Sequence, residues 1–128
     1  MGNKVTHINS NAFAYLIDLQ DISLPTSLQH IDSAAFYLDK KITQITIPQN
    51  VSYIGSSAFG SCYNVSSIVF NAKRTNDIES NWGMPFGACG SDHGGFTLTI
   101  GENVEEIGAY MFRSGVITSC SINSTKLK

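Results

Sequence analysis

The chain has 128 residues, a formal net charge of −2 and only 14% charged side chains. Without a basic cluster it lacks the charge pattern of a nucleic-acid-binding protein. No run of about 18 apolar residues occurs and the N-terminal residues lack the apolar stretch of a signal peptide, so we expect one domain with no direct membrane insertion.

Short strands are the first elements that the pattern predicts. Each has apolar residues at alternate positions with polar neighbours, which is typical of a strand with one buried face. Pro25 and Pro48 end two of these strands, because proline has no N–H to continue a ladder. The expected strands span residues 19–24, 42–47, 65–70, 96–100 and 117–122.

A return leg follows each strand. In the clearest copy it begins with Val51 and Ile54, and no run has the length and period of a long helix. We therefore expect a short turn, a 3-10 helix or a single helical turn. Gly55 and Gly108 follow the apolar residues of two return legs and are expected to permit a tight bend there.

A phenylalanine closes each return leg at a nearly constant spacing. Phe13, Phe36 and Phe59 recur every 23 residues, Phe86 follows after 27 and Phe112 after a further 26. A period in this range indicates a stacked array, in which each unit buries its apolar face only against its neighbours. The spacing predicts about five stacked units.

The repeat resembles a known family. The segment ITQITIPQNVSYIGSSAFGSC, residues 42–62, is similar to the leucine-rich repeats of BspA-like (Treponema-type) bacterial cell-surface proteins, and the resemblance covers about residues 5–122. It implies an α/β-type solenoid that is mainly β in content: a right-handed leucine-rich-repeat superhelix with a parallel concave β-sheet and short turns or 3-10 helices on the convex side. A single leucine-rich-repeat domain would then occupy residues 1–128.

The repeat is irregular between residues 71 and 95, and we interpret this stretch as an insertion. Inserted loops on a repeat scaffold often carry the specific contacts. Trp82, the only tryptophan, either anchors a partner or packs down and holds the loop in place. Ser91, Asp92 and His93 are adjacent in a Gly-rich stretch and are interpreted as turn residues, because catalytic triads are assembled from distant positions.

The concave sheet face is predicted to be a neutral, hydrogen-bonding surface of Ser, Thr and Gln side chains. Exposed aromatic side chains are common binding anchors, so Phe96 is the sharpest candidate on this face, although it could instead fold into the inserted loop. The predicted ligand-binding residues are Thr43, Gln44, Thr46, Ser67, Val69, Trp82 and Phe96.

The three cysteines are interpreted as small buried residues with inert thiols. Cys62 and Cys89 share one repeat position, and a disulfide between them is the alternative. Cys120 takes a strand position that is apolar in other units. No cysteine pair has the spacing of a zinc site, so neither a metal nor another cofactor is expected.

The resemblance implies a non-catalytic protein-binding or adhesion module of a bacterial surface-exposed or secreted leucine-rich-repeat protein. The expected partner is a host or bacterial surface protein, or alternatively a glycan. The alternative function is a structural spacer or self-assembling repeat segment without its own ligand. Neither end carries a dedicated cap, so we expect a fragment of a longer repeat protein whose uncapped ends promote self-association.

Overall fold

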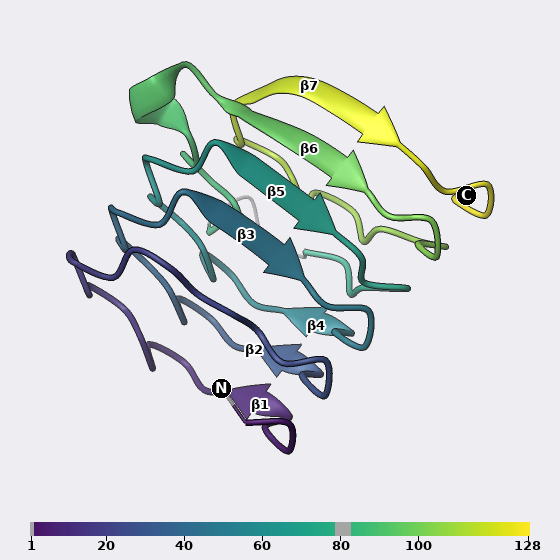
Figure 1. Cartoon of the computed structure of the whole chain (residues 1–128), viewed down its shortest axis with the longest axis horizontal. Coiled ribbons are helices and arrows are strands. Elements are labelled where there is room, and N and C mark those ends of the chain that lie inside the picture. The colour runs from purple at the N-terminus through teal and green to yellow at the C-terminus, as the bar shows by residue number, and fades with distance from the viewer. Residues whose placement is uncertain (1, 79–82) are drawn as a thin grey trace.

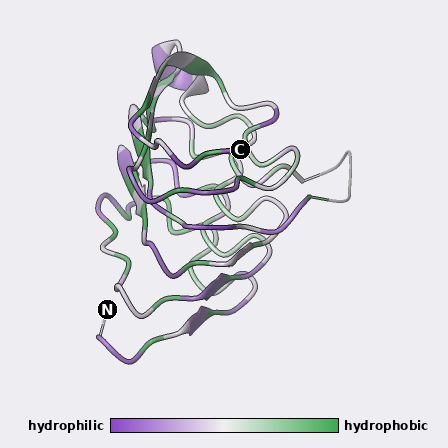
Figure 2. Ribbon diagram, turned by 90° about the vertical axis from the view of Figure 1, so that its right-hand side faces the viewer, coloured by the Kyte–Doolittle hydropathy of each residue, from purple (hydrophilic) through white to green (hydrophobic). Residues whose placement is uncertain are grey.

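Stacked turns of chain form a parallel solenoid in the structure, a computed structural model that describes residues 2–78 and 83–128. About five turns wind right-handedly along one axis (Figure 1). Figure 2 shows the strands of one sheet along one side of the stack and looped turns along the other. The predicted fold class is confirmed. No helix in the described residues is long and apolar enough to cross a membrane.

The larger sheet holds four of the five predicted strands. These are β3 (Gln44–Ile47), β5 (Ser67–Phe70), β6 (Phe96–Ile100) and β7 (Ile117–Ile122), which pair in that order and in parallel. Alternate side chains of a strand point to opposite faces, so aligned positions form rows across the sheet. The inward rows Ile45–Ile68–Leu98 and Ile47–Phe70–Ile100 are buried.

The strand predicted over residues 19–24 is absent. These residues form neither a strand nor a ladder with β3, and Leu19, Ile22 and Leu24 are only partly buried against the core. In the described residues no strand lies beside residues 19–24 on the side away from β3, so burial of their apolar side chains stabilises a strand there less.

Three return legs begin with a two-residue strand before the predicted short turn, and these strands form a second parallel sheet. β1 (His7–Ile8), β2 (His30–Ile31) and β4 (Tyr53–Ile54) pair in this order, and their arrows point opposite to those of the larger sheet (Figure 1). Adjacent units lie one strand spacing apart, so their backbones reach one another, as in the 2.8 Å bond from Gln29 N to Thr6 O. The one 3-10 helix of the described residues is η1 (Ser91–His93), in the insertion.

A side-chain amide takes the place of the next strand beyond β4. The N–H of Ile54 donates to Asn76 Oδ1 at 2.9 Å, and Asn76 Nδ2 donates to Ile54 O at 3.2 Å. The amide therefore makes the two hydrogen bonds that a neighbouring backbone would make, where the inserted chain has left the regular path.

Turns that carry the phenylalanines complete each unit. Alternate N–H groups donate to the following unit, as in the 2.7 Å bond from Phe36 N to Ala58 O. Two residues of each turn segment have a positive φ, among them Ala34 at 56° and Leu38 at 62°. A positive φ costs about 1–2 kcal/mol for a residue other than glycine. The backbone hydrogen bonds between units offset that cost.

The five phenylalanines form one continuous stack. The ring centroids of neighbours lie between 5.1 and 5.3 Å apart from Phe13 through Phe36, Phe59 and Phe86 to Phe112. The first three ring pairs lie within 6° of parallel, and the pair of Phe86 and Phe112 is tilted by 20°. The extra residues between the later phenylalanines therefore loop out without breaking the register of the rings.

Gly55 and Gly108 permit close approach between units, not the predicted bend. Neither has a positive φ. A Cβ on Gly55 would lie 2.5 Å from the backbone N of Ser33, and one on Gly108 would overlap the carbonyl oxygen of Asn76. Both glycines are therefore required by the neighbouring backbone.

Candidate binding surface

The outward side of the larger sheet carries two aligned rows of side chains. The rows are Gln44, Ser67, Thr97, Ser119 and Thr46, Val69, Thr99, Ser121, and we call these eight residues the sheet face. None of them is charged, and Val69 is the one apolar member. The structure thus brings four of the predicted binding residues together, and Thr43 is exposed just before β3.

The polar groups of the sheet face are largely free. Within the described residues, the one side-chain hydrogen bond of this surface is the 3.4 Å bond from Thr97 Oγ1 to Ser66 O. Gln44 and Thr46 are exposed, and Ser67 is half-buried. Their amide and hydroxyl groups can donate and accept hydrogen bonds with a partner without first breaking bonds within the protein.

A hollow of about 420 Å³ opens at one edge of the sheet face, where residues 19–24 do not pair with β3. We call it the strand-end hollow, and it is lined by Leu24, Thr26, Thr46, Pro48, Gln49, Asn50 and Asn71. Leu24 and Pro48 supply apolar walls, and the other residues supply polar groups. Its volume lies within the range of small-ligand sites, about 300–1,000 Å³. Thr46 belongs to both surfaces and connects them.

Phe96 is fully buried, so its predicted place as an exposed anchor is wrong. Alternation along β6 puts Phe96 on the same inward side as Leu98 and Ile100. Its ring packs beside Gly115, where an added Cβ would lie 3.2 Å from Phe96 Cζ. The alternation was already visible in the sequence, and applying it strictly places Phe96 in the core.

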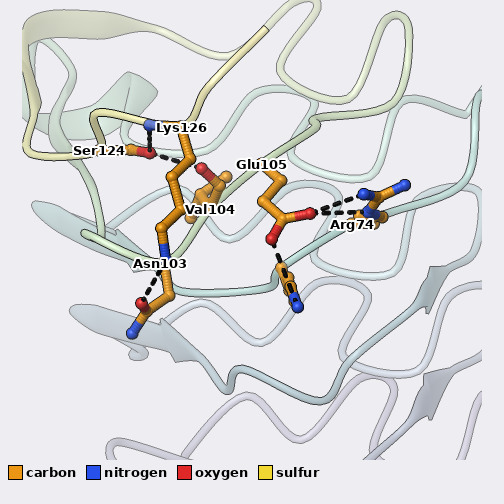
Figure 3. Close-up of polar contacts among 7 residues, drawn as sticks. Arg74, Asn103, Val104, Glu105, Ser124 and Lys126 are labelled. Atoms are coloured by element: carbon orange, nitrogen blue, oxygen red, sulfur yellow. Dashed lines mark hydrogen bonds and ion pairs between the residues drawn. The ribbon is translucent and has the colours of Figure 1, made fainter.

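An ion-pair cluster fastens the start of the insertion to the last unit (Figure 3). Arg74 donates to Glu105 Oε2 through Nε at 3.0 Å and Nη2 at 2.7 Å, and Lys73 Nζ lies 3.3 Å from Glu105 Oε1. The hydrogen bond from Arg74 is the main cause that lowers the pKa of Glu105. These two cations of the insertion are therefore held by Glu105. Trp82 lies outside the described residues.

The thiols of Cys62 and Cys89 are buried and unbridged. Cys62 Sγ donates to Phe36 O at 3.2 Å, and Cys89 Sγ donates to Phe59 O at 3.1 Å. The neighbouring thiol of Cys89 and, after it, burial raise the pKa of the Cys62 thiol, so it stays protonated and inert. The prediction that Cys120 is buried is wrong: it is exposed on β7, which has no strand beyond it in the described chain.

Asp39 is the buried carboxyl group of the described residues. Its Oδ1 accepts a 2.8 Å hydrogen bond from Leu16 N, and its Oδ2 has no partner. Burial raises the pKa of Asp39 to about 6, and the bond from Leu16 opposes that rise. The group lies in the core and contacts neither the sheet face nor the strand-end hollow.

The described residues contain no group of three His, Cys, Asp or Glu side chains that could hold a metal ion. Ser91, Asp92 and His93 form the single turn η1 and are exposed, which fits their interpretation as turn residues. The arrangement offers a hydrogen-bonding face and an adjoining hollow, which suit binding of a partner.

The sequence comparisons agree with the stacked architecture. The family description BspA type Leucine rich repeat region matches residues 1–113 in six copies. The chain belongs to this family. No curated protein and no solved structure matches the chain. The sheet face of this BspA-type chain was predicted from its strand positions, but the strand-end hollow was not. The available signal was that residues 19–24 are the first strand-type segment of the sequence, with a second one on one side only.

Proposed function

We propose that the chain is a non-catalytic protein-binding module of the adhesion type, which engages its partner through the sheet face. The observation that carries this proposal is the set of eight aligned, uncharged side chains beside the strand-end hollow, six of which have hydrogen-bonding groups without a partner in the described residues. A surface without charge suits a partner that presents polar, weakly charged groups.

The two parts of the surface have complementary roles in this proposal. The strand-end hollow receives an apolar side chain of the partner against Leu24 and Pro48, because buried anchors in pockets carry most of the free energy of binding. Gln44, Thr46 and Ser67 form hydrogen bonds around that anchor and fix the orientation of the partner.

Membership of the BspA-type family supports a bacterial surface-exposed or secreted setting. The proposed partner is accordingly a host or bacterial surface protein. A glycan is the alternative, because hydroxyl and amide groups also suit sugar hydroxyls.

Substitution of Thr46 by Arg tests the proposal. Arrays of surface proteins and of glycans would first identify a ligand. Thr46→Arg should then raise Kd at least tenfold, about 1.4 kcal/mol, because the long side chain fills the hollow and covers the face. Ser10→Arg is the matched control, since Ser10 is an exposed turn residue outside the surface.

The outcomes distinguish the candidates. Equal Kd values for the wild type and Thr46→Arg, with matching circular dichroism, would place the binding site elsewhere. Binding to glycans alone would change the class of partner. The second candidate is a structural spacer, which the continuous stack of phenylalanine rings favours. Failure to bind on either array would support it.

A further inference from the structure

His7 and His30 form a stacked pair on the smaller sheet. They lie directly opposite each other in the parallel pairing of β1 and β2, so two adjacent units bring them one strand spacing apart. Their ring centroids are 4.4 Å apart and their ring planes differ by 16°. The other face of the His30 ring stacks on Tyr53, with the centroids 5.7 Å apart, so the pair is supported from the next unit.

Both imidazole rings lie on the outward side of the smaller sheet. Ile8 and Ile31 follow the two histidines and are buried in the core, so the alternation of side chains directs the histidines away from the core. His7 is exposed and His30 is half-buried. An ion in the solvent can therefore reach both rings without any opening of the stack.

Thr6 orients the ring of His7. Its Oγ1 lies 2.9 Å from His7 Nδ1, and within the described residues it is the one hydrogen-bond partner of either ring. When Nδ1 carries the proton, it donates to Thr6 Oγ1, and the lone pair of His7 Nε2 is free to bind a metal ion. Histidines that bind metals almost always donate a hydrogen bond from the other ring nitrogen, which fixes the tautomer and the ring orientation.

We propose that His7 and His30 together bind one divalent transition-metal ion that prefers imidazole ligands, such as Zn²⁺, and that water fills its remaining coordination positions. Two nitrogens bound to one Zn²⁺ lie no more than about 4 Å apart, because each Zn–N bond is about 2.0–2.1 Å long. The two ring centroids are separated by a similar distance, so small rotations of the rings bring one nitrogen of each to the ion.

The proposed site is open and links two adjacent units. With two protein ligands, it fits the finding that no group of three ligating side chains occurs in the described residues. It shares no residue with the sheet face or the strand-end hollow, so it is independent of the proposed function.

Isothermal titration calorimetry of the whole, untagged chain with zinc chloride at neutral pH tests the site. Every protein carries Cys120→Ser, because an exposed thiolate also binds Zn²⁺. The otherwise unchanged chain should bind Zn²⁺ with a one-to-one ratio, and His30→Gln should raise Kd at least about tenfold because one of the two ligands is lost. His93→Gln is the matched control, since His93 is an exposed histidine of η1 outside the pair.

Two results would overturn the proposal. One is equal Kd values for His30→Gln and His93→Gln, with matching circular dichroism of both variants. The other is the absence of Zn²⁺ binding at millimolar concentrations of the ion.

Substitution of Thr6 tests its role as a positioning residue. Thr6→Val removes the hydroxyl group at nearly constant size and should raise Kd about tenfold, whereas Thr6→Ser keeps the hydroxyl and should bind like the unchanged chain. Nitrogen-15 NMR of the imidazole rings should show Zn²⁺ on Nε2 of His7 and the proton on Nδ1. Zinc on Nδ1, or equal Kd values for Thr6→Val and Thr6→Ser, would overturn this role of Thr6.

Discussion

Asp39 occupies the position that Cys62 and Cys89 occupy in the next two units, three residues after the phenylalanine of its turn. The thiols are small and apolar enough for the core, whereas burial of an ionised carboxylate costs free energy because the group loses its hydration. One oxygen of Asp39 is satisfied by Leu16 N and the other has no partner in the described residues. The first turn is thus fixed to the second by a group that is costly when ionised.

Asp39→Asn should stabilise the protein above pH 6. The folded-state pKa, about 6, exceeds the ordinary 3.8, so the folded protein binds this proton more tightly than the unfolded chain does. The contribution of Asp39 to stability is therefore lost as the pH rises from about 4 through 6. Asparagine keeps the acceptor for Leu16 without the charge, and should raise the free energy of unfolding at pH 7 by about 1–3 kcal/mol.

Urea unfolding between pH 4 and 8 measures this effect. The difference between Asp39→Asn and the wild type should be largest above pH 6 and small at pH 4. Asp18→Asn is the control, because Asp18 is exposed and paired with Lys41 at 2.7 Å, and it should change stability by about 0.5 kcal/mol or less. The same pH profile for Asp39→Asn and the wild type would exclude Asp39 as the titrating group.

At the scale of elements, the smaller sheet joins the N-terminal units and the larger sheet joins the later ones, and the insertion interrupts only the smaller sheet. The larger sheet runs from β5 directly to β6, although 30 residues separate the aligned Ser67 and Thr97. Beyond β4 the backbone diverges, and Asn76 supplies both hydrogen bonds that Ile54 would otherwise lack. A repeat array can therefore accept extra residues if one side chain completes the interrupted ladder.

Asn76→Ala should destabilise the protein markedly. Ile54 is fully buried, so its N–H and C=O would lose their partners at a cost of about 1–3 kcal/mol for each group. Asn50→Ala is a matched control, because Asn50 makes a single exposed bond to Thr26 O and its loss should cost less than about 1 kcal/mol. Equal losses in thermal unfolding of the two variants would show that Asn76 does not replace a strand.

At the scale of the whole molecule, the solenoid behaves as a one-dimensional stack whose units contact only their neighbours. The stack of phenylalanine rings illustrates the dependence on neighbours. Phe59 is fully buried between Phe36 and Phe86. Phe13 has a ring on one side only and is half-buried. Stability should therefore depend on the position of a unit in the stack.

Phe59→Ala should lower the free energy of unfolding by about 3–5 kcal/mol, because it empties a buried site in the middle of the stack. Phe13→Ala removes the same atoms at the end of the stack and should cost clearly less, because its cavity is partly open to solvent. Denaturant unfolding of both variants measures the difference. Equal losses would contradict the dependence on position.

Much of the fold could be predicted because the same interface recurs in every unit. The phenylalanine spacing and the alternation around Ile45, Ile68 and Leu98 reflect one packing requirement repeated along the chain. The same alternation predicts the sheet face, and it also places Phe96 on the inward side with Leu98 and Ile100. The short strands that begin three return legs could not be predicted, because a strand of two residues leaves almost no periodicity in the sequence.

The sequence by itself determined the stacking period, the inward rows and the uncharged sheet face, because these depend on side-chain chemistry at regular positions. Tertiary structure alone decided that residues 19–24 stay unpaired, that Asn76 replaces a strand and that Cys120 is exposed on β7. Each of these depends on whether a neighbouring backbone lies within hydrogen-bonding distance. Residues far away in the chain decide whether such a neighbour is present, so it cannot be predicted from the local sequence.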